Sequence, residues 1–110
     1  AEQIKNAVTL LTKENNVVIL TGGTGLSKRD ITPEAIIPLL DKRIAGADET
    51  IRRYGQERMP YAMLSRSVVG TIGDCLVLAL PGSSTGVAES LDAVFPALFH
   101  SFKALKGERH

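Results

Sequence analysis

Two turns hold most of the residues in this chain that could do chemistry, and the first runs from Thr21 to Pro33. It contains three glycines within five residues, followed by Lys28, Arg29 and Asp30. Glycines let a main chain approach a ligand closely and adopt positive φ, as a bound phosphate or planar ring requires. A carboxylate beside a phosphate site most commonly holds Mg²⁺. The same residues could instead form a plain tight turn in which Asp30 is an extra helix cap.

The second turn, Leu80–Gly86, carries three consecutive hydroxyl side chains, Ser83, Ser84 and Thr85. Backbone N–H groups and hydroxyls where a helix begins can bind a carboxylate, an amide or a phosphate. They can equally cap the helix and do nothing more. Each turn follows an apolar run, and parallel neighbouring strands end at the same edge of a sheet. We therefore expect the two turns to lie together and form one cleft.

The N-terminal half of the chain predicts a helix, a strand and a second helix. An apolar stripe at helical spacing predicts the first helix, through Ile4, Ala7, Val8 and Leu11. The continuous apolar run Val17–Leu20 predicts a strand buried on both faces. Thr32 is expected to be the N-cap of the second helix. That helix should continue to Ile44, with a kink or late start at Pro38, and end at Gly46.

The C-terminal half predicts a helix, two strands and further helices. Residues 48–58 predict a polar helix, mostly solvated or at a subunit contact. Residues 67–72 and 75–80 predict two strands joined by a turn at residues 73–74. The helix after them should face inward with Val87, Ala88, Leu91 and Val94, and another should follow from Pro96 to Gly107. Strands that alternate with helices predict a layered α/β domain.

Length and charge exclude several classes of protein. The 110 residues, with 13 lysines and arginines against 12 acidic residues, predict a single domain over residues 1–110 without a global field for nucleic acid or an anionic membrane. No apolar run reaches the roughly 20 residues that span a bilayer. The chain opens without the pattern of a secretion signal, and Cys75 is the one cysteine, so we expect a cytoplasmic protein. His100 and His110 stand apart, which argues against a zinc site or a histidine triad.

Four sequence blocks resemble the molybdopterin-binding domain of the MogA/MoaB family, which is similar to the G domain of gephyrin. They are Thr21–Gly25, Arg29–Glu34, Met63–Ser67 and Leu80–Gly82, in the family's order and spacing. The resemblance implies a three-layer α/β/α sandwich with a mostly parallel sheet plus a β-hairpin. It also implies a cytoplasmic homotrimer in molybdenum cofactor biosynthesis, which adenylylates molybdopterin with Mg²⁺ and ATP and releases pyrophosphate.

The resemblance also implies site residues. Asp30 would be the acidic residue essential for turnover and would hold Mg²⁺. The residues expected to bind the nucleotide or molybdopterin lie in the two turns and beside Arg66: Thr21, Gly22, Gly23, Thr24, Gly25, Ser65, Ser67, Pro81, Gly82, Ser83 and Ser84.

Ser83 and Ser84 follow Pro81-Gly82 where gephyrin-like members usually have Asn-Pro. This pair is closer to MoaB-type sequences, some of which are not adenylyltransferases. A non-catalytic molybdopterin-binding or assembly module is therefore the alternative function. A generic nucleotide-binding α/β domain ranks third, and the first turn matches neither common glycine-rich nucleotide pattern.

The family's domain begins with a strand and helix that do not precede Ala1 here. The resemblance thus implies the C-terminal two-thirds of a domain whose N-terminal strand-helix portion is missing from these 110 residues. Its sheet would have an unpaired edge, which a piece beside it or a neighbouring subunit would cover. Fusion to other cofactor-biosynthesis proteins, or handover with them, also fits the resemblance.

Overall fold

A mixed β-sheet between two layers of helices forms the framework of the chain. The computed structural model describes residues 2–56, 66–95 and 97–100. In them the strands are β1 (Val17–Thr21), β2 (Lys42–Arg43), β3 (Val68–Ile72) and β4 (Cys75–Leu80), in the spatial order β1-β4-β3-β2. β1 pairs with β4 in parallel, whereas β4 with β3 and β3 with β2 pair antiparallel.

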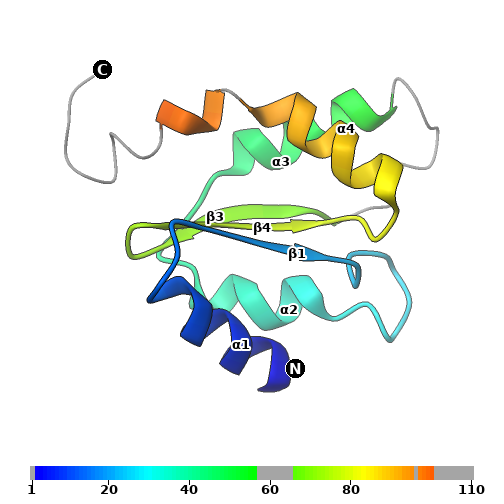
Figure 1. Cartoon of the computed structure of the whole chain (residues 1–110). Helices are drawn as coiled ribbons and strands as arrows, with labels where there is room; N and C mark the ends of the chain where they lie inside the picture. The colour runs from blue at the N-terminus through cyan, green and yellow to red at the C-terminus, as the bar shows by residue number, and fades with distance from the viewer. Residues whose placement is uncertain (1, 57–65, 96, 101–110) are drawn as a thin grey trace.

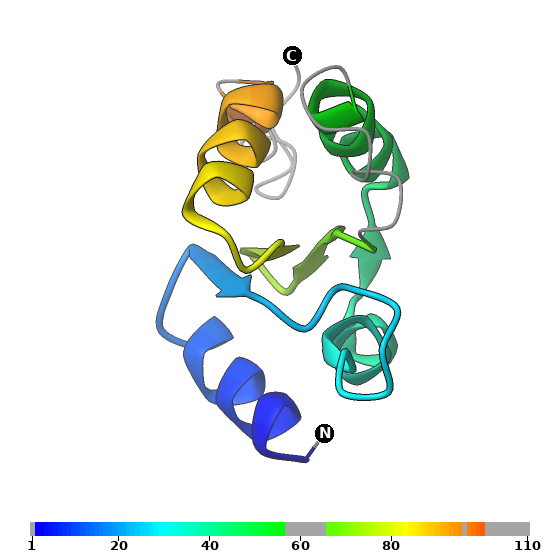
Figure 2. The same cartoon turned by 90° about the vertical axis from the view of Figure 1, so that its right-hand side faces the viewer.

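The helices cover both faces of this sheet. They are α1 (Glu2–Thr12), α2 (Thr32–Ile36) with the 3₁₀ turn η1 (Ile37–Leu39), α3 (Ala45–Gln56), α4 (Ser84–Val94) and the 3₁₀ turn η3 (Ala97–Phe99). α1 and α2 lie on one side of the sheet, and α3 and α4 lie on the other (Figures 1 and 2). The predicted α/β/α sandwich with a β-hairpin is confirmed. A mostly parallel sheet was expected, whereas the described strands form a mixed sheet in which β1–β4 is the parallel pair.

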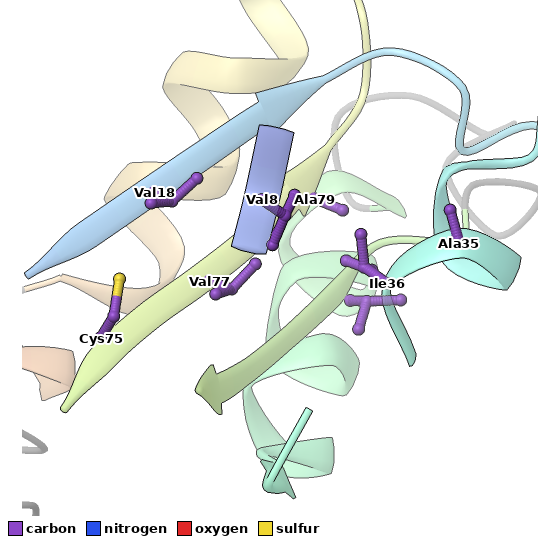
Figure 3. Packing of buried hydrophobic residues seen from close by; sticks show 8 residues of the cluster. Val8, Val18, Ala35, Ile36, Cys75, Val77 and Ala79 are labelled. Carbon is purple, nitrogen blue, oxygen red and sulfur yellow. The ribbon is translucent and has the colours of Figure 1, made fainter. Parts of the chain in front are cut away.

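β4 is the centre of the core on both faces. Its odd-numbered residues, Cys75, Val77 and Ala79, pack with α1 and α2 (Figure 3). Its even-numbered residues, Leu76, Leu78 and Leu80, pack with α3 and α4. All six are at most 1% exposed, as expected of a strand covered by helices on both faces.

β1 is less buried than its apolar sequence predicts. Val18 is buried against α1, but the Ile19 side chain is 43% exposed. β1 pairs only with β4 among the described residues and forms one edge of the sheet. The prediction of a strand buried on both faces is therefore wrong, because an apolar run does not show whether its strand is central or at an edge.

The predicted helix from Thr32 to Ile44 is also wrong beyond its first turns. α2 ends at Ile36, and after η1 the chain becomes extended at Leu40 and forms β2. Pro38 has no N–H to continue an α-helical ladder. Gly70 on β3 has no side chain, and a Cβ there would come within 2.6 Å of the Lys42 carbonyl oxygen. That space lets β2 pair closely with β3.

Two smaller expectations at helix ends also fail. The N-cap of α2 is Ile31, and Thr32 is instead a buried residue whose Oγ1 donates to the Gly22 carbonyl at 3.1 Å. Gly46 lies inside α3 rather than ending a helix.

The predicted polar helix, residues 48–58, corresponds to α3 up to Gln56, and part of it is buried. Ala47 and Ile51 belong to the core, and Asp48 is only 1% exposed. Asp48 accepts hydrogen bonds from the Val69 N–H at 2.6 Å and from Arg43 Nε at 2.9 Å. Burial raises the pKa of Asp48, although both hydrogen bonds and the Arg43 charge oppose that shift. The Asp48 carboxylate thus provides a hydrogen-bond acceptor for the Val69 N–H of β3, at a position where β2 no longer pairs with β3.

Replacing Asp48 by alanine should lower the free energy of unfolding by about 2–3 kcal/mol, because the buried Val69 N–H would lose its acceptor and Arg43 its counter-charge. Chemical denaturation measures the change. Glu49→Ala, at the exposed neighbouring position on α3, is the matched control and should change stability by less than about 0.5 kcal/mol. Equal effects of the two substitutions would show that Asp48 does not support β3.

The C-terminal expectations hold in part. In α4, Val87 and Leu91 pack against the core and Val94 is buried, but Ala88 is exposed. Ser90 faces inward instead, and its Oγ donates to the Gly86 carbonyl at 2.6 Å. Residues 97–99 form η3 rather than α-helix, and Pro96 and residues 101–110 lie outside the described residues. Within the described residues, no helix combines the length and apolarity of a membrane span.

Candidate functional site

The two turns that the sequence singles out lie against each other. β1 and β4 run parallel with Thr21 opposite Leu80, so both strands end at the same edge of the sheet (right-hand side of Figure 1). The Gly22 N–H donates to the Leu80 carbonyl at 2.9 Å. A Cβ on Gly82 would be 3.3 Å from the Gly22 Cα. The predicted meeting of the turns is confirmed, and glycine at both positions permits the close approach.

The first turn depends on left-handed glycines. Gly22 has φ of 90° and Gly23 has φ of 70°, backbone angles that residues other than glycine rarely adopt. Thr32 holds both residues in place, because its Oγ1 donates to the Gly22 carbonyl and its N–H donates to the Gly23 carbonyl at 3.1 Å. Thr32 was predicted as a helix cap, so its role in shaping the turn was missed.

Replacing Gly23 by alanine should destabilise the protein by at least about 1–2 kcal/mol, the cost of a left-handed backbone for a residue with a Cβ. The added Cβ would also lie 2.2 Å from Thr32 Oγ1, so that Thr32 must move. Thermal unfolding measures the loss. The control is Gly46→Ala in α3, where a Cβ has nothing within 4 Å and should not lower stability. A Gly23→Ala protein as stable as the control would contradict the account of this turn.

Asp30 is held by the first turn itself. Its Oδ2 accepts from the Ser27 N–H at 3.1 Å and from the Ser27 Oγ at 2.8 Å. These bonds are the main reason that the pKa of Asp30 is lowered, and the Arg66 charge contributes further. Asp30 is therefore ionised at neutral pH. The helix α2 receives no side-chain cap, so the interpretation of Asp30 as an extra cap is wrong.

Arg66 connects this turn to the rest of the site. Its Nε donates to the Gly25 carbonyl at 2.9 Å, one terminal nitrogen donates to the Asp30 carbonyl at 2.6 Å, and the other pairs with Glu34 at 2.6 Å. The backbone N–H of Arg66 donates to the Thr24 carbonyl at 2.7 Å. Ser65 and Ser67 beside Arg66 were predicted as site residues, whereas Arg66 itself was missed. A cation between two candidate site residues was the available signal.

The remaining predicted residues are placed differently from one another. Thr24 and Ser67 are buried, at 4% and 0% exposure, and both have interaction partners within the protein. Gly82 and Ser83 are exposed beside the first turn, and Pro81 is half-buried. Ser83 is the N-cap of α4, and its Oγ accepts from the Gly86 N–H at 3.0 Å. Ser84 is the first residue of α4, and Ser65 lies outside the described residues.

The charges around the turns suit a phosphate ligand with Mg²⁺. Lys28 and Arg29 are exposed on the first turn, next to ionised Asp30. No group of three or more metal-ligating side chains exists in the part of the chain that the structure describes. Mg²⁺ is commonly held by one or two carboxylates together with substrate phosphates and water. Asp30 alone therefore fits a metal that arrives with a phosphate ligand, and it does not form a metal cage.

Comparison with known families and curated proteins gives one consistent picture. The family described as "Probable molybdopterin binding domain" matches residues 1–100. The molybdenum cofactor biosynthesis bifunctional protein of Chlorobaculum tepidum is 39% identical over 84% of this chain and 30% of its own length. Molybdenum cofactor biosynthesis protein B of Staphylococcus carnosus is 41% identical over 82% of this chain and 55% of its own. Gephyrin of Dictyostelium discoideum is 39% identical over 91% of this chain and 14% of its own length.

Solved structures agree with this picture. The molybdopterin biosynthesis Mog protein of Mycobacterium ulcerans superposes with a TM-score of 0.92 at 34% identity, over 98% of this chain and 71% of that one. The molybdopterin biosynthesis enzyme MoaB of Thermus thermophilus superposes with a TM-score of 0.87 at 41% identity, over 97% of this chain and 69% of that one. The chain spans only 14% to 55% of the three curated relatives described above.

Proposed function

The chain belongs to the family of probable molybdopterin binding domains, and on that premise we propose that it binds molybdopterin and adenylylates it with ATP and Mg²⁺. The observation that carries the proposal is the contact between the two glycine turns, with Gly22 bonded to Leu80 and packed against Gly82. Molybdenum cofactor biosynthesis is the shared description of its relatives.

In the proposed reaction, an oxygen of the molybdopterin phosphate forms a bond to the α-phosphorus of ATP. The bond from that phosphorus to the bridging oxygen breaks, and pyrophosphate leaves with the electron pair. Such transfers depend mainly on positioning and on neutralising charge. The half-buried main chain at Gly22 and the exposed main chain at Gly82 and Ser83 would position the reactants. Lys28 and Arg29 would add local positive charge.

Asp30 would hold Mg²⁺ in this reaction. When bound, the metal neutralises phosphate charge and favours displacement at phosphorus. Both Ser27 bonds go to Oδ2 of Asp30 and keep the carboxylate ionised and oriented. Arg66 fixes the main chain on both sides of this arrangement, through the carbonyls of Gly25 and Asp30. These residues would therefore place one negative charge at a fixed point beside the phosphates.

A non-catalytic binding or assembly module remains the second candidate. Ser83 uses its hydroxyl to cap α4, and the Ser83-Ser84 pair is the feature that resembles MoaB-type sequences. Both candidates share the molybdopterin site and differ only in the transfer step. The relatives that are bifunctional proteins or gephyrin support a fusion partner for this domain. We also propose a homotrimer, which light scattering would test.

Among the described residues, β1 has a strand on one side only and forms an edge of the sheet. Ile19 is 43% exposed at this edge, and the matched solved structures are longer than the chain. We propose that a strand from outside residues 1–110, or from a neighbouring subunit, covers it. Amide hydrogen exchange would then be slow at the outward-facing N–H groups of β1 in the assembled protein and fast if that edge stays open.

The binding step can be tested by titrating molybdopterin into ¹⁵N-labelled protein under anaerobic conditions. The amide resonances of Gly22 and Gly82 should shift together and saturate at the same concentration. Gly73, in the β3–β4 turn, is the internal reference and should not shift. Shifts confined to residues away from both turns would contradict the proposed site.

A further inference from the structure

A second feature of the structure lies beside β3, at the edge of the sheet formed by the short strand β2. β2 pairs with Thr71 and Gly70 only, so the beginning of β3, at Val68, pairs with β4 on one side and has no described strand on its other side. The gap between α2 and α3 at this point is a cavity of about 350 Å³. Its described lining is partly apolar, from Ile37 and Val68, and partly charged, from Arg43, Arg52, Arg66 and Glu34.

The charged lining is mostly positive. Three arginines from three separate segments, β2, α3 and the residue pair before β3, meet one glutamate. This concentration of positive charge is local, because the whole chain has a net charge of only +1. Asp48 and Glu34 pair with Arg43 and Arg66, so within the described residues the excess positive charge at the cavity lies on Arg52. An excess positive charge beside two further guanidiniums is suited to a negatively charged ligand.

The three arginines differ in how far the protein already neutralises them. Arg43 donates through Nε to Asp48, and Arg66 pairs with Glu34. No hydrogen bond or ion pair joins the Arg52 guanidinium to another residue in the described part of the chain, and its charge acts on Asp48. A guanidinium has five N–H donors in a planar fork. The one hydrogen bond from Arg43 to a described residue uses a single donor.

We propose that this cavity binds a phosphate group, with Arg52 as its principal ligand and Arg43 as its second. Guanidinium forks match the geometry of phosphate and form short, charge-assisted hydrogen bonds to it. Arg66 separates the cavity from the first turn, since its other nitrogens bond to Gly25 and Asp30. The proposal stands on the cavity alone and does not require molybdopterin or adenylylation.

The test is a titration of the protein with inorganic phosphate at constant ionic strength, followed through the Nε–H resonances of the arginines. Arg52→Gln removes the guanidinium that would bind the phosphate and keeps a helix-forming residue at this position. Arg53→Gln is the matched control, because it removes the same charge from an exposed adjacent position of α3 that does not line the cavity. A parallel titration with ATP shows whether the phosphate is preferred free or as part of a larger molecule.

In the wild-type protein, the Arg52 and Arg43 signals should shift and saturate. Arg52→Gln should weaken phosphate binding at least about tenfold, since a charge-assisted contact is lost, and Arg53→Gln should leave it within about twofold. Tighter binding of ATP, lost in Arg52→Gln, would identify the ligand as a phosphate carried by a larger molecule. Equal weakening by the two variants, or shifts that do not saturate, would overturn the proposal. Molybdopterin binding at the glycine turns should be unchanged in Arg52→Gln, so the two proposals fail separately.

Discussion

Replacing Asp30 by asparagine is expected to abolish adenylylation of molybdopterin, with a fall in rate of at least about 10³-fold. Asparagine keeps the size of the side chain, and its carbonyl oxygen can still accept the Ser27 hydrogen bonds seen at Asp30 Oδ2. The turn should therefore keep its shape while losing the negative charge that would hold Mg²⁺. Molybdopterin binding should remain within a few-fold of wild type.

The matched control for this substitution is Asp92→Asn on the exposed side of α4, which should leave both rate and binding unchanged. Pyrophosphate release and molybdopterin titration are measured on the same preparations. If Asp30→Asn weakened binding as much as it lowered the rate, Asp30 would be a structural residue of the turn. That result would contradict the catalytic role assigned to it.

Arg66→Lys is expected to weaken molybdopterin binding at least about tenfold and to lower the free energy of unfolding by about 2 kcal/mol. A lysine cannot reproduce the fork that reaches Gly25, Asp30 and Glu34 at once. The first turn would then lose its connection to the start of β3. Chemical denaturation and a molybdopterin titration measure the two effects.

Arg53→Lys, the same substitution at an exposed position of α3, serves as the control and should behave as wild type. Glu34→Gln adds a second comparison, because it removes the ion pair and leaves both carbonyl contacts of Arg66 in place. It should have a smaller effect on binding than Arg66→Lys. Loss of stability in Arg66→Lys with unchanged binding would limit Arg66 to supporting the fold.

The elements with strong local signals could be predicted from the sequence. The helix α1, the hairpin around Gly73 and the N-cap Ser83 appear in the structure as expected. The predicted apolar stripe of α1 is only partly confirmed, because Val8 is buried and Ile4 half-buried whereas Ala7 and Leu11 are exposed. β2 could not be predicted, because Lys42 and Arg43 have no apolar alternation and pair only through contacts with distant β3. The burial of Asp48 is likewise decided by a backbone N–H that lies 21 residues away.

The position of the site could be predicted from the sequence, but the hydrogen bonds that hold the first turn in place could not. Parallel pairing of β1 with β4 was enough to bring both glycine turns together. The hydrogen bonds of Thr32 to the first turn and of Arg66 to Gly25 join residues that are 10 and 41 positions apart. Such contacts follow from the packing of α2 and β3 against the turn, which no local pattern encodes. Ser27 likewise went unnoticed because exposed serines in turns are common.

Release of pyrophosphate from ATP in the presence of molybdopterin is the measurement that decides whether this chain adenylylates molybdopterin. With Mg²⁺ the protein should release one pyrophosphate for each molybdopterin adenylylated, and Asp30→Asn should release none above background. Saturable molybdopterin binding without any pyrophosphate release would contradict the proposed adenylylation and assign the chain to the non-catalytic binding module.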